Sequence, residues 1–267
     1  MPGAGALGLE GRVAIVTGAA KGMGEAICAA LADEGARLVL AGRRLEPLQA
    51  SAERLNRGAG EVRAVALACD VTDERDAAQL AGVACERFGR IDVLVNTAGV
   101  IGPIETPAQD LGVEDFRSVL DVNVVGTFLA CKAVIPTMLA QHHGRIVNIS
   151  GTSGLRGYRN RAAYSASKWA VRGLTRTLAL ELGPYDITVN DICPNATHGP
   201  RMDKIVNAKA QHLGKSYEEV YADYAGQTAL RRFIDADDVA QAVLFLAGDR
   251  AANVTGHDLV VDAGWDV

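Results

Sequence analysis

The chain has 267 residues, of which 49% are hydrophobic and 22% are charged, and its formal net charge is −5. An acidic balance without clustered Lys and Arg argues against a nucleic-acid or anionic-membrane surface, so we expect a small-molecule partner. The 5 cysteines are scattered and form no C-x-x-C pair, which argues against a disulfide framework and against a metal site.

Strand-like and helical patterns alternate along the chain, as expected for a parallel sheet with helices on both faces. Several strand-like runs are solidly apolar, for example residues 13–16 and 93–95, which is typical of strands covered on both faces. Ligands of such sheets bind beyond the carboxyl ends of the strands, so the residues just after each run are candidate site residues. The expected strands are 12–17, 37–41, 62–68, 91–95, 145–150, 187–192 and 257–261.

A glycine-rich turn with the spacing G-x-x-x-G-x-G follows the first expected strand and leads into a helix. Glycines let backbone N–H groups approach a pyrophosphate at a helix N-terminus, where the helix dipole favours negative charge. Such a run alone could be an ordinary turn, but the strand before it and the helix after it favour dinucleotide binding. The candidate cofactor-binding residues of this turn are Gly18, Ala20, Lys21, Gly22, Met23 and Gly24.

The second expected strand is followed by Gly42, Arg43 and Arg44 rather than by an acidic residue. A carboxylate here would bind the adenosine ribose hydroxyls of NAD, whereas the guanidinium of Arg43 suits a 2′-phosphate. Lys21 adds a second candidate charge. The pattern predicts NADP(H) as the preferred cofactor and NAD(H) as the second candidate; the alternative is a solvated loop at a helix start.

Polar and small residues follow the third and fourth expected strands. Asp70, next to Val71, could accept a hydrogen bond from an adenine amino group, or it could cap the helix that begins near residue 72. Asn96, Ala98 and Gly99 permit close backbone approach to a nucleotide, although a tight turn also needs small residues.

A long helical stretch from about residue 113 to residue 141 carries Asn123 among valines. A buried Asn must be hydrogen-bonded. Asn123 is therefore either a structural cross-brace or part of a proton relay, and both readings stay open.

The longest amphipathic pattern, residues 162–182, carries Tyr164 and Lys168 near its start. Side chains four apart stack on one face of a helix. An ammonium within about 4–6 Å favours the phenolate and lowers the pKa of a Tyr, which can then pass a proton to or from a substrate oxygen. Taken alone, a Y-x-x-x-K pair fits a surface Tyr and a solvated Lys, but the other motifs favour catalysis.

These motifs, in this order, resemble the short-chain dehydrogenase/reductase family from about residue 11 to residue 264. The resemblance implies one Rossmann-like, doubly wound α/β domain over residues 1–267, with a seven-stranded parallel sheet and an NAD(P)(H) cofactor. It also implies that a secondary alcohol and a ketone are interconverted by hydride transfer. The matching segments are 17–24, 96–99, Asn123, Tyr164 with Lys168, Pro194, and 254–264.

The resemblance assigns roles to individual residues. Tyr164 is the acid/base, Lys168 holds the nicotinamide ribose and lowers the pKa of Tyr164, and Asn123 belongs to a water-mediated proton relay. Pro194 and Thr197 are expected among the cofactor-binding residues.

Two positions depart from the family pattern. The substrate-orienting Ser that the family places thirteen residues before the Tyr is Gly151 here, and the family's Pro-Gly after the sixth strand is Pro194-Asn195. Asn tolerates a left-handed backbone best after Gly, so we expect that turn still to form. If the chain stays extended after the fifth strand, Ser153 points the same way as Gly151 and replaces the missing hydroxyl. Alternatively, Ser153 bonds local backbone in a turn.

The missing Ser also motivates a different function, a catalytically silent dinucleotide-binding protein that senses redox state or partners another subunit. The presence of Tyr164, Lys168 and Asn123 together argues against this alternative. A dehydratase or epimerase of the same fold is a weaker third reading.

Residues 197–228 correspond to the family's variable substrate-covering region. Its Met202, Tyr217, Tyr221 and Tyr224 could line an apolar pocket, although packing within their own domain explains them better. Three arginines, Arg156, Arg159 and Arg161, hint at a polar or anionic substrate, but a solvated loop face is the favoured explanation.

The stretches 121–141 and 162–182 carry more apolar surface than one sheet face requires, and the family commonly pairs these helices across a two-fold axis. We therefore expect a homotetramer or a homodimer. No basic N-terminal segment and no run of about 18 apolar residues stand out, so the expected location is the cytoplasm.

Overall fold

The computed structural model describes residues 7–58 and 60–265 and contains one sheet of seven parallel strands in the order β3-β2-β1-β4-β5-β6-β7. The predicted α/β fold class and its seven strands are confirmed, and the strand ends differ from the predicted ones by at most two residues. The strands are β1 (Val13–Thr17), β2 (Arg37–Gly42), β3 (Ala64–Ala68), β4 (Val93–Asn96), β5 (Gly144–Ile149), β6 (Ile187–Pro194) and β7 (Asp258–Val261).

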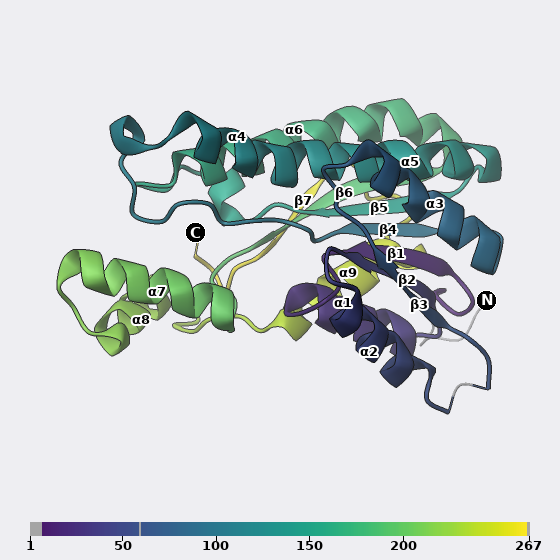
Figure 1. The fold of residues 1–267 in the computed structure, drawn as a ribbon, viewed down its shortest axis with the longest axis horizontal. Helices are drawn as coiled ribbons and strands as arrows, with labels where there is room; N and C mark the ends of the chain where they lie inside the picture. Colours follow the sequence, from purple (N-terminus) through teal and green to yellow (C-terminus); the bar gives the residue numbers. More distant parts are fainter. Residues whose placement is uncertain (1–6, 59, 266–267) are drawn as a thin grey trace.

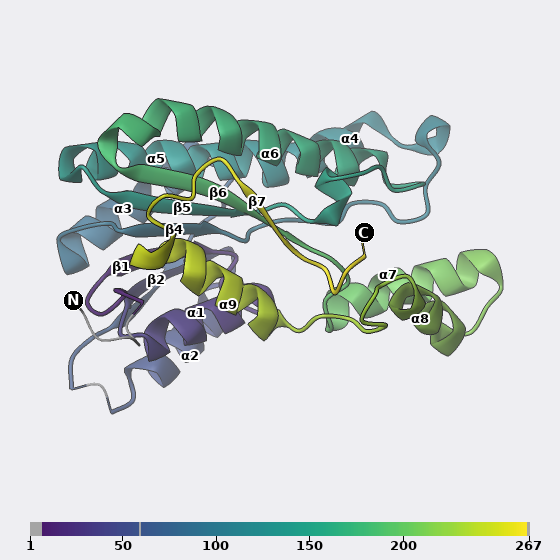
Figure 2. The ribbon, with the colours of Figure 1, turned by 180° about the vertical axis from the view of Figure 1, so that it is seen from behind.

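Helices cover both faces of this sheet (Figures 1 and 2). One face carries α1 (Met23–Asp33), α2 (Leu45–Asn56) and α9 (Ala236–Ala247), and the other carries α3 (Glu74–Phe88), α5 (Gly126–Gln141) and α6 (Ala162–Leu182). Neighbouring residues of β1 belong to different apolar clusters, because successive side chains of a strand point to opposite faces. The solidly apolar strand runs in the sequence reflect burial on both faces.

The order of the strands reverses at β1, which has β2 on one side and β4 on the other. Ligands of open α/β sheets bind in the crevice that such a reversal leaves at the carboxyl ends of the strands. The backbones after β1 and β4 pack closely here. A Cβ on Gly18 would lie 2.8 Å from the Ala98 nitrogen, and a Cβ on Gly24 would lie 2.3 Å from the Gly18 oxygen, so only glycine fits at these two positions.

The helix Val113–Gln141 consists of α4 (Val113–Leu120), a π-helical turn (Asp121–Val125) and α5. Among the described residues it is the one helix long and apolar enough to cross a membrane, contrary to our expectation that no such stretch exists. A core helix passes the same test of length and composition. This helix packs against α3 and α6, and its Cys131, Val134 and Met138 are fully buried, so a place in the helical layer accounts for its apolar character.

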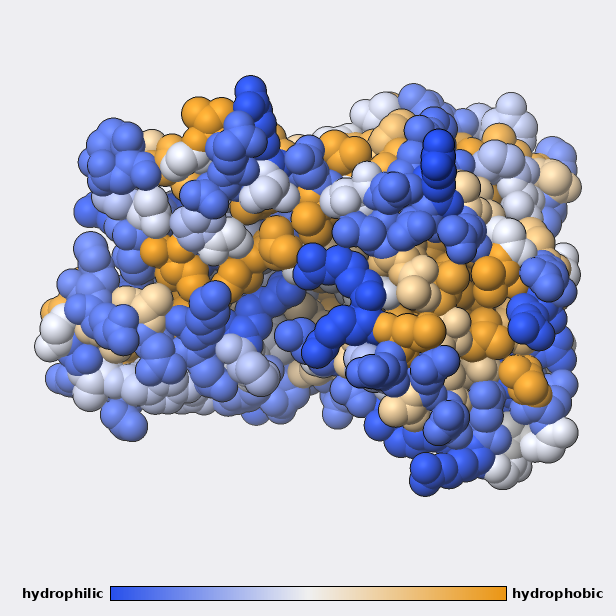
Figure 3. Space-filling model, viewed as in Figure 1, coloured by the Kyte–Doolittle hydropathy of each residue, from blue (hydrophilic) through white to orange (hydrophobic). Residues whose placement is uncertain are grey.

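Two further helices, α7 (Pro200–Leu213) and α8 (Tyr217–Gly226), lie apart from the two helical layers, beyond the carboxyl ends of the strands (Figure 1). Their apolar side chains pack against one another and against Phe233, and Tyr217, Tyr221 and Tyr224 flank this cluster. The favoured reading, packing within their own segment, is confirmed for these residues. Hydrophobic side chains also line the hollow between these helices and the rest of the molecule (Figure 3).

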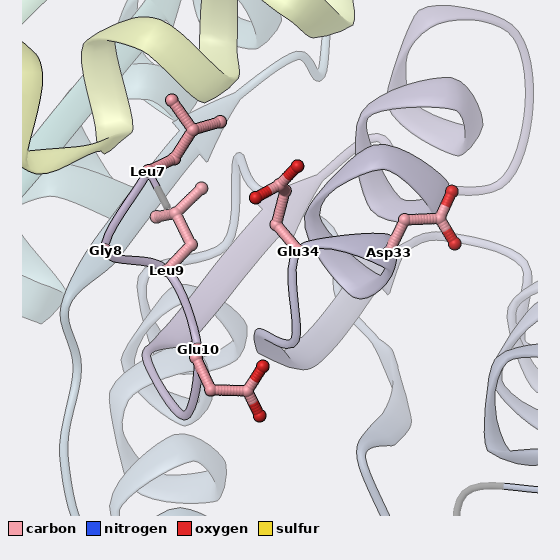
Figure 4. A pocket seen from close by; sticks show the side chains of 6 residues that line it. All are labelled: Leu7, Gly8, Leu9, Glu10, Asp33 and Glu34. Atoms are coloured by element: carbon pink, nitrogen blue, oxygen red, sulfur yellow. The ribbon is translucent and has the colours of Figure 1, made fainter. Parts of the chain in front are cut away.

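A pocket of about 210 Å³ lies at the opposite end of the sheet, near the amino ends of β1 and β2 (Figure 4). Three carboxylates line it, which disfavours an anionic ligand such as a nucleotide. We therefore place the candidate site in the crevice at the carboxyl ends of the strands. The pocket is lined by Leu7, Gly8, Leu9, Glu10, Asp33 and Glu34.

Candidate active site

The glycine-rich turn after β1 leaves an open cradle at the N-terminus of α1. Gly22 precedes the helix with φ of 59°, and a Cβ built there would meet no atom within 4 Å. No side chain caps α1, so the N–H groups of its first turn are free to bind an anion. The cradle has the form that a pyrophosphate needs, and binding by Gly18, Ala20, Lys21, Gly22, Met23 and Gly24 stays a prediction.

Two candidate cations for a 2′-phosphate follow β1 and β2. Arg43, just past β2, and Lys21 are both exposed. Arg43 lies near Asp70, because its charge is among the causes that hold the pKa of Asp70 below its usual value, after the hydrogen bonds from Thr72. A 2′-phosphate bound beside Arg43 would find a guanidinium that no carboxylate pairs with among the described residues.

Asp70 forms a local turn rather than a helix cap. Its Oδ1 accepts hydrogen bonds from the Thr72 N–H at 3.0 Å and the Thr72 hydroxyl at 2.8 Å. The cap of α3 is Asp73, which accepts from the first-turn N–H groups of Arg75 and Asp76. The capping alternative for Asp70 is therefore wrong, and its contact with adenine stays a prediction, as does that of the buried Val71.

The side chain of Asn96 is committed to the fold. It donates to the Asn148 side-chain oxygen at 3.0 Å and to the Cys131 sulfur at 3.4 Å, which ties β4 to β5 and to α5. Its side chain is thus not available to a ligand. The small residues Ala98 and Gly99 line the crevice, and a Cβ on Gly99 would lie 3.9 Å from Lys168 Nζ.

Tyr164 and Lys168 meet on α6, as their spacing predicted. Lys168 is buried, with its Nζ 5.6 Å from the centroid of the Tyr164 ring, and it donates to the Ile149 carbonyl at 2.8 Å. Two of its three N–H donors have no hydrogen-bond partner among the described residues, so they can bind ribose hydroxyls. Burial lowers the pKa of Lys168.

The phenol of Tyr164 is tuned toward ionisation. Burial acts to raise the pKa of Tyr164, but the charges of Lys168, Arg201 and Arg161 outweigh it, and the Ser153 hydroxyl adds to their effect. The pKa therefore lies below its ordinary value. A phenol with a lowered pKa at the mouth of a crevice suits proton exchange with a substrate oxygen.

The Asn123 side chain braces the loop after β4. Its oxygen accepts from the Val100 N–H at 2.8 Å, and its nitrogen donates to the Val100 carbonyl at 3.0 Å and to the Ser167 hydroxyl at 2.9 Å. This geometry is that of a cross-brace between the loop and α6. A relay role for Asn123 stays a prediction.

The chain turns immediately after β5 instead of staying extended, because residues Thr152–Gly154 form a 3₁₀ turn. The expectation that the chain stays extended after the fifth strand, from which we selected Ser153, is therefore wrong. The turn still brings Ser153 to the position in question. A Cβ built on Gly151 would lie 3.9 Å from the Ser153 Oγ and 4.0 Å from the Tyr164 hydroxyl oxygen, so both hydroxyls border the space that Gly151 leaves.

Ser153 and Ser150 have different surroundings. The Ser153 hydroxyl is buried and has no partner of full hydrogen-bond geometry among the described residues. Ser150 points away from Tyr164, and both its hydroxyl and its N–H donate to the carboxylate of Asp191. Ser153 is therefore the hydroxyl placed beside Tyr164 to donate to a substrate oxygen, while Ser150 anchors the loop to β6.

Asp191 belongs to a buried polar group behind the site. Its carboxylate, the Cys193 sulfur and the Asp258 carboxylate lie within 4.8 Å of one another, a spacing that could hold a metal ion. Asp258 is, however, already paired with Arg172 at 2.7 Å and with Arg176. Burial raises the pKa of Asp191 to about 7. We assign this group to the support of the loop after β5.

Both departures from the family pattern have a structural explanation. Gly151 has φ of 130°, a conformation that L residues rarely adopt, so this backbone suits a glycine and disfavours the Ser of the family pattern. Asn195 does not need the left-handed backbone that we expected, since it is absent from the non-glycine residues with positive φ. Its side-chain oxygen instead accepts a hydrogen bond from the Thr152 hydroxyl at 3.2 Å. The Thr197 hydroxyl donates to the Asn195 carbonyl at 2.9 Å. Pro194 ends β6 directly before this turn.

The sequence did not predict that two cations and a second tyrosine lie near Tyr164. Arg161, expected on a solvated face, is buried with its guanidinium 4.8 Å from the Tyr164 ring centroid. Arg201 reaches from α7 to the Gly99 carbonyl at 2.8 Å. Tyr158 bonds the Thr152 hydroxyl at 2.8 Å and stacks on Trp265. Only the crowding of arginines before Tyr164 was visible in the sequence.

Comparisons with known proteins agree with this geometry. Residues 18–266 match the family model described as enoyl-(acyl carrier protein) reductase. The chain is 38% identical to trans-4-hydroxycyclohexanecarboxylate dehydrogenase of Sinomonas cyclohexanicum, over 95% of this chain and 92% of that protein.

Two solved structures have the same fold. An NAD⁺-bound xylitol dehydrogenase superimposes with a TM-score of 0.91 at 35% identity, covering 96% of this chain and 99% of that one. A variant of actinorhodin polyketide ketoreductase with NADPH gives a TM-score of 0.89 at 36% identity, covering 95% and 97%. With the dinucleotide cradle, the Tyr164–Lys168 pair and these matches, the chain belongs to the short-chain dehydrogenase/reductase family of oxidoreductases.

Proposed function

We propose that the protein interconverts a secondary alcohol and a ketone, with NADP(H) preferred over NAD(H) and Tyr164 as the acid/base. The observation that carries the proposal is the convergence of three groups: Lys168 Nζ lies 5.6 Å from the Tyr164 ring centroid, and the hydroxyls of Tyr164 and Ser153 both border the space that Gly151 leaves. A bound nicotinamide dinucleotide would supply the hydride acceptor or donor. The structures of two relatives contain NAD⁺ in one case and NADPH in the other, so the preference for NADP(H) rests on Arg43 and Lys21 of this chain.

In this mechanism each of the site residues has a defined role. In ketone reduction Tyr164 donates its proton to the carbonyl oxygen, and in alcohol oxidation its phenolate takes the hydroxyl proton. Ser153 donates a hydrogen bond to the same oxygen, which stabilises the charge that develops there. Lys168 favours the phenolate through its charge and offers its free N–H donors to the ribose. The cradle before α1 would hold the pyrophosphate.

The segment 197–228 is proposed to cover the substrate. Its helices α7 and α8 lie beyond the carboxyl ends of the strands, and Arg201 joins α7 to the loop after β4. The names of the relatives include both a charged alcohol, trans-4-hydroxycyclohexanecarboxylate, and a neutral one, xylitol. The substrate class therefore has to be argued from the residues of this crevice.

We also propose an isologous homo-oligomer, with a tetramer ahead of a dimer. The outer faces of α5 and α6 expose large apolar side chains, and Phe128, Trp169 and Leu180 are 44%, 49% and 82% exposed. Exposed apolar patches of this kind mark interaction surfaces. Light scattering at micromolar concentration tests the proposal, and a species of only 28.0 kDa would refute it.

The competing function is a silent dinucleotide-binding protein, motivated by Gly151. A panel assay separates the two: ketones are offered with NADPH, alcohols with NADP⁺, and the absorbance of the reduced cofactor is followed. The panel includes cyclohexanone, 4-oxocyclohexanecarboxylate and xylitol. Turnover of any member removes the silent reading. Cofactor binding without turnover of any member would overturn the proposed function.

A further inference from the structure

Arg161 is a buried cation without a carboxylate partner. Arg161 is 8% exposed, and it lies directly before α6, seven residues before Lys168 and three residues before Tyr164. None of the ion pairs within residues 7–58 and 60–265 involves it. One Nη donates to the Ile101 carbonyl at 3.1 Å, while the buried Nε has no hydrogen-bond partner among these residues.

An anion bound at Arg161 would offset the cost of this arrangement. A guanidinium has five N–H donors, and a buried charge that is not paired carries a large desolvation penalty. Burial also lowers the pKa of Arg161, which shows the same penalty. Arg172, whose side chain is 12% exposed, is paired with Asp258 at 2.7 Å. The fold therefore supplies a carboxylate to Arg172 and supplies none to Arg161.

The surroundings of Arg161 are those of a substrate crevice. Its guanidinium carbon lies 4.8 Å from the centroid of the ring of Tyr164, the proposed acid/base. The phenols of Tyr164, Tyr224 and Tyr158 and the carboxylate of Glu105 all act electrostatically on it. Glu105 is the one carboxylate of this set, yet it accepts from the Asn160 amide at 3.3 Å and forms no ion pair with the guanidinium. Arg201 adds a second cation, whose charge also reaches Tyr164.

We propose that Arg161 binds a carboxylate of the substrate, so that the protein acts on small oxo acids and the matching hydroxy acids. The proposal deepens the function proposed above and rests on it. The guanidinium and a carboxylate form two parallel hydrogen bonds, which fix the orientation of the carbonyl group relative to Tyr164. Arg161 supplies the positive charge that pairs with the carboxylate, and the carboxylate offsets the desolvation cost of the buried guanidinium.

A competing role for Arg161 is to act on Tyr164 alone, through its charge above the ring. The two roles predict different selectivity. A residue that acts only through Tyr164 changes the turnover of charged and neutral ketones by the same factor and shifts the pH profile of both. A residue that binds the substrate carboxylate changes the ratio between them.

The first test compares kcat/KM for 4-oxocyclohexanecarboxylate with kcat/KM for its methyl ester. The second test uses calorimetry on the NADP⁺-loaded protein to compare the affinity for cyclohexanecarboxylate with the affinity for cyclohexanecarboxamide. A bidentate charge-assisted pair predicts that the acid is preferred by about 10- to 100-fold in kcat/KM and in affinity. Arg161→Met should remove this preference, because kcat/KM for the acid falls by a larger factor than kcat/KM for the ester; the loss of the Arg161 charge beside Tyr164 affects both substrates alike. Arg159→Met is the matched control, because Arg159 is an exposed cation of the same loop and should leave the preference intact.

The outcomes separate this inference from the proposed function. Turnover of the ester equal to that of the acid, or an acid preference that survives in Arg161→Met, overturns the inference and leaves the alcohol–ketone activity standing. No turnover with a retained 10-fold preference for the carboxylate over the amide overturns the proposed function while supporting the carboxylate site. If Arg161→Met does not fold, Arg161→Gln serves in its place, since Gln is polar and carries no charge.

Discussion

Replacing Ser153 by Ala removes a hydroxyl that borders the same space as the Tyr164 hydroxyl. Its Oγ is buried, has no partner of full hydrogen-bond geometry among the described residues, and lies next to the space that Gly151 leaves. Loss of one such donor from a desolvated site costs about 2.7–4 kcal/mol in the transition state, which corresponds to about a 10²- to 10³-fold loss of kcat. Cofactor affinity should not change, because Ser153 lies outside the dinucleotide cradle.

The same substitution should also shift the pH profile. The Ser153 hydroxyl is among the causes that lower the pKa of Tyr164, after the three cations. Its removal should raise that pKa. The kcat/KM for alcohol oxidation, which needs the phenolate, should therefore begin to rise at a higher pH than in the unaltered protein. The assay is kcat/KM against pH for both variants, with NADP⁺ affinity measured by calorimetry.

Ser150→Ala is the matched control. Ser150 points to Asp191, so its loss leaves a buried carboxylate with one donor fewer and should lower the free energy of unfolding by about 1–3 kcal/mol. The kinetic effect should be much smaller than that of Ser153→Ala. Unchanged kinetics in Ser153→Ala, together with abolished turnover in Ser150→Ala, would refute the assignment of the two hydroxyls.

Three further predictions concern the cofactor, the backbone and a buried acid. Arg43→Ala should weaken NADP(H) binding with little change in NAD(H) binding, as measured by calorimetry; equal loss for both would contradict the 2′-phosphate contact. Gly151→Ser should lower the free energy of unfolding by about 1–3 kcal/mol, because φ of 130° is strained for an L residue. Burial raises the pKa of Asp191 from 3.8 to about 7, so the folded state binds more protons between these values, and the stability contributed by protonated Asp191 is lost as pH rises from about 4 to about 7. Asp191→Asn should remove this loss, which is measured as the free energy of unfolding from urea titrations at pH values across that range. If the variant keeps the same difference in stability between about pH 4 and about pH 7, Asp191 is not the group responsible for the loss.

The fold was predictable because its signals are local and repeated. Each strand run between helical patterns reports the same layered architecture, and residues 13–16 are solidly apolar because β1 is buried on both faces. The spacing of Tyr164 and Lys168 also suffices to place both on one face of α6. The π-helical turn Asp121–Val125 was not predictable, since its residues read as part of one continuous helix.

The parts of the site that depend on tertiary packing could not be read from the sequence. The turn after β5 follows from the unusual φ of Gly151, and a glycine in a sequence does not specify which of its many backbone conformations it adopts. Arg156, Arg159 and Arg161 look equivalent in the sequence, yet only Arg161 is buried, because the chain carries it toward the Ile101 carbonyl. Asp70 and Asp73 are likewise chemically identical, and the true start of α3 decides which of them is the cap.

Tyr164→Phe tests the central claim most directly, because it keeps the ring packed between Lys168 and Arg161 and removes only the proton carrier. The measurement is kcat on a ketone that the unaltered protein reduces, together with the affinity for NADP⁺. A positioned acid/base contributes about 10²- to 10⁴-fold, so kcat should fall by this factor while the affinity for NADP⁺ is unchanged. Near-normal turnover in Tyr164→Phe would contradict the assignment of Tyr164 as the acid/base.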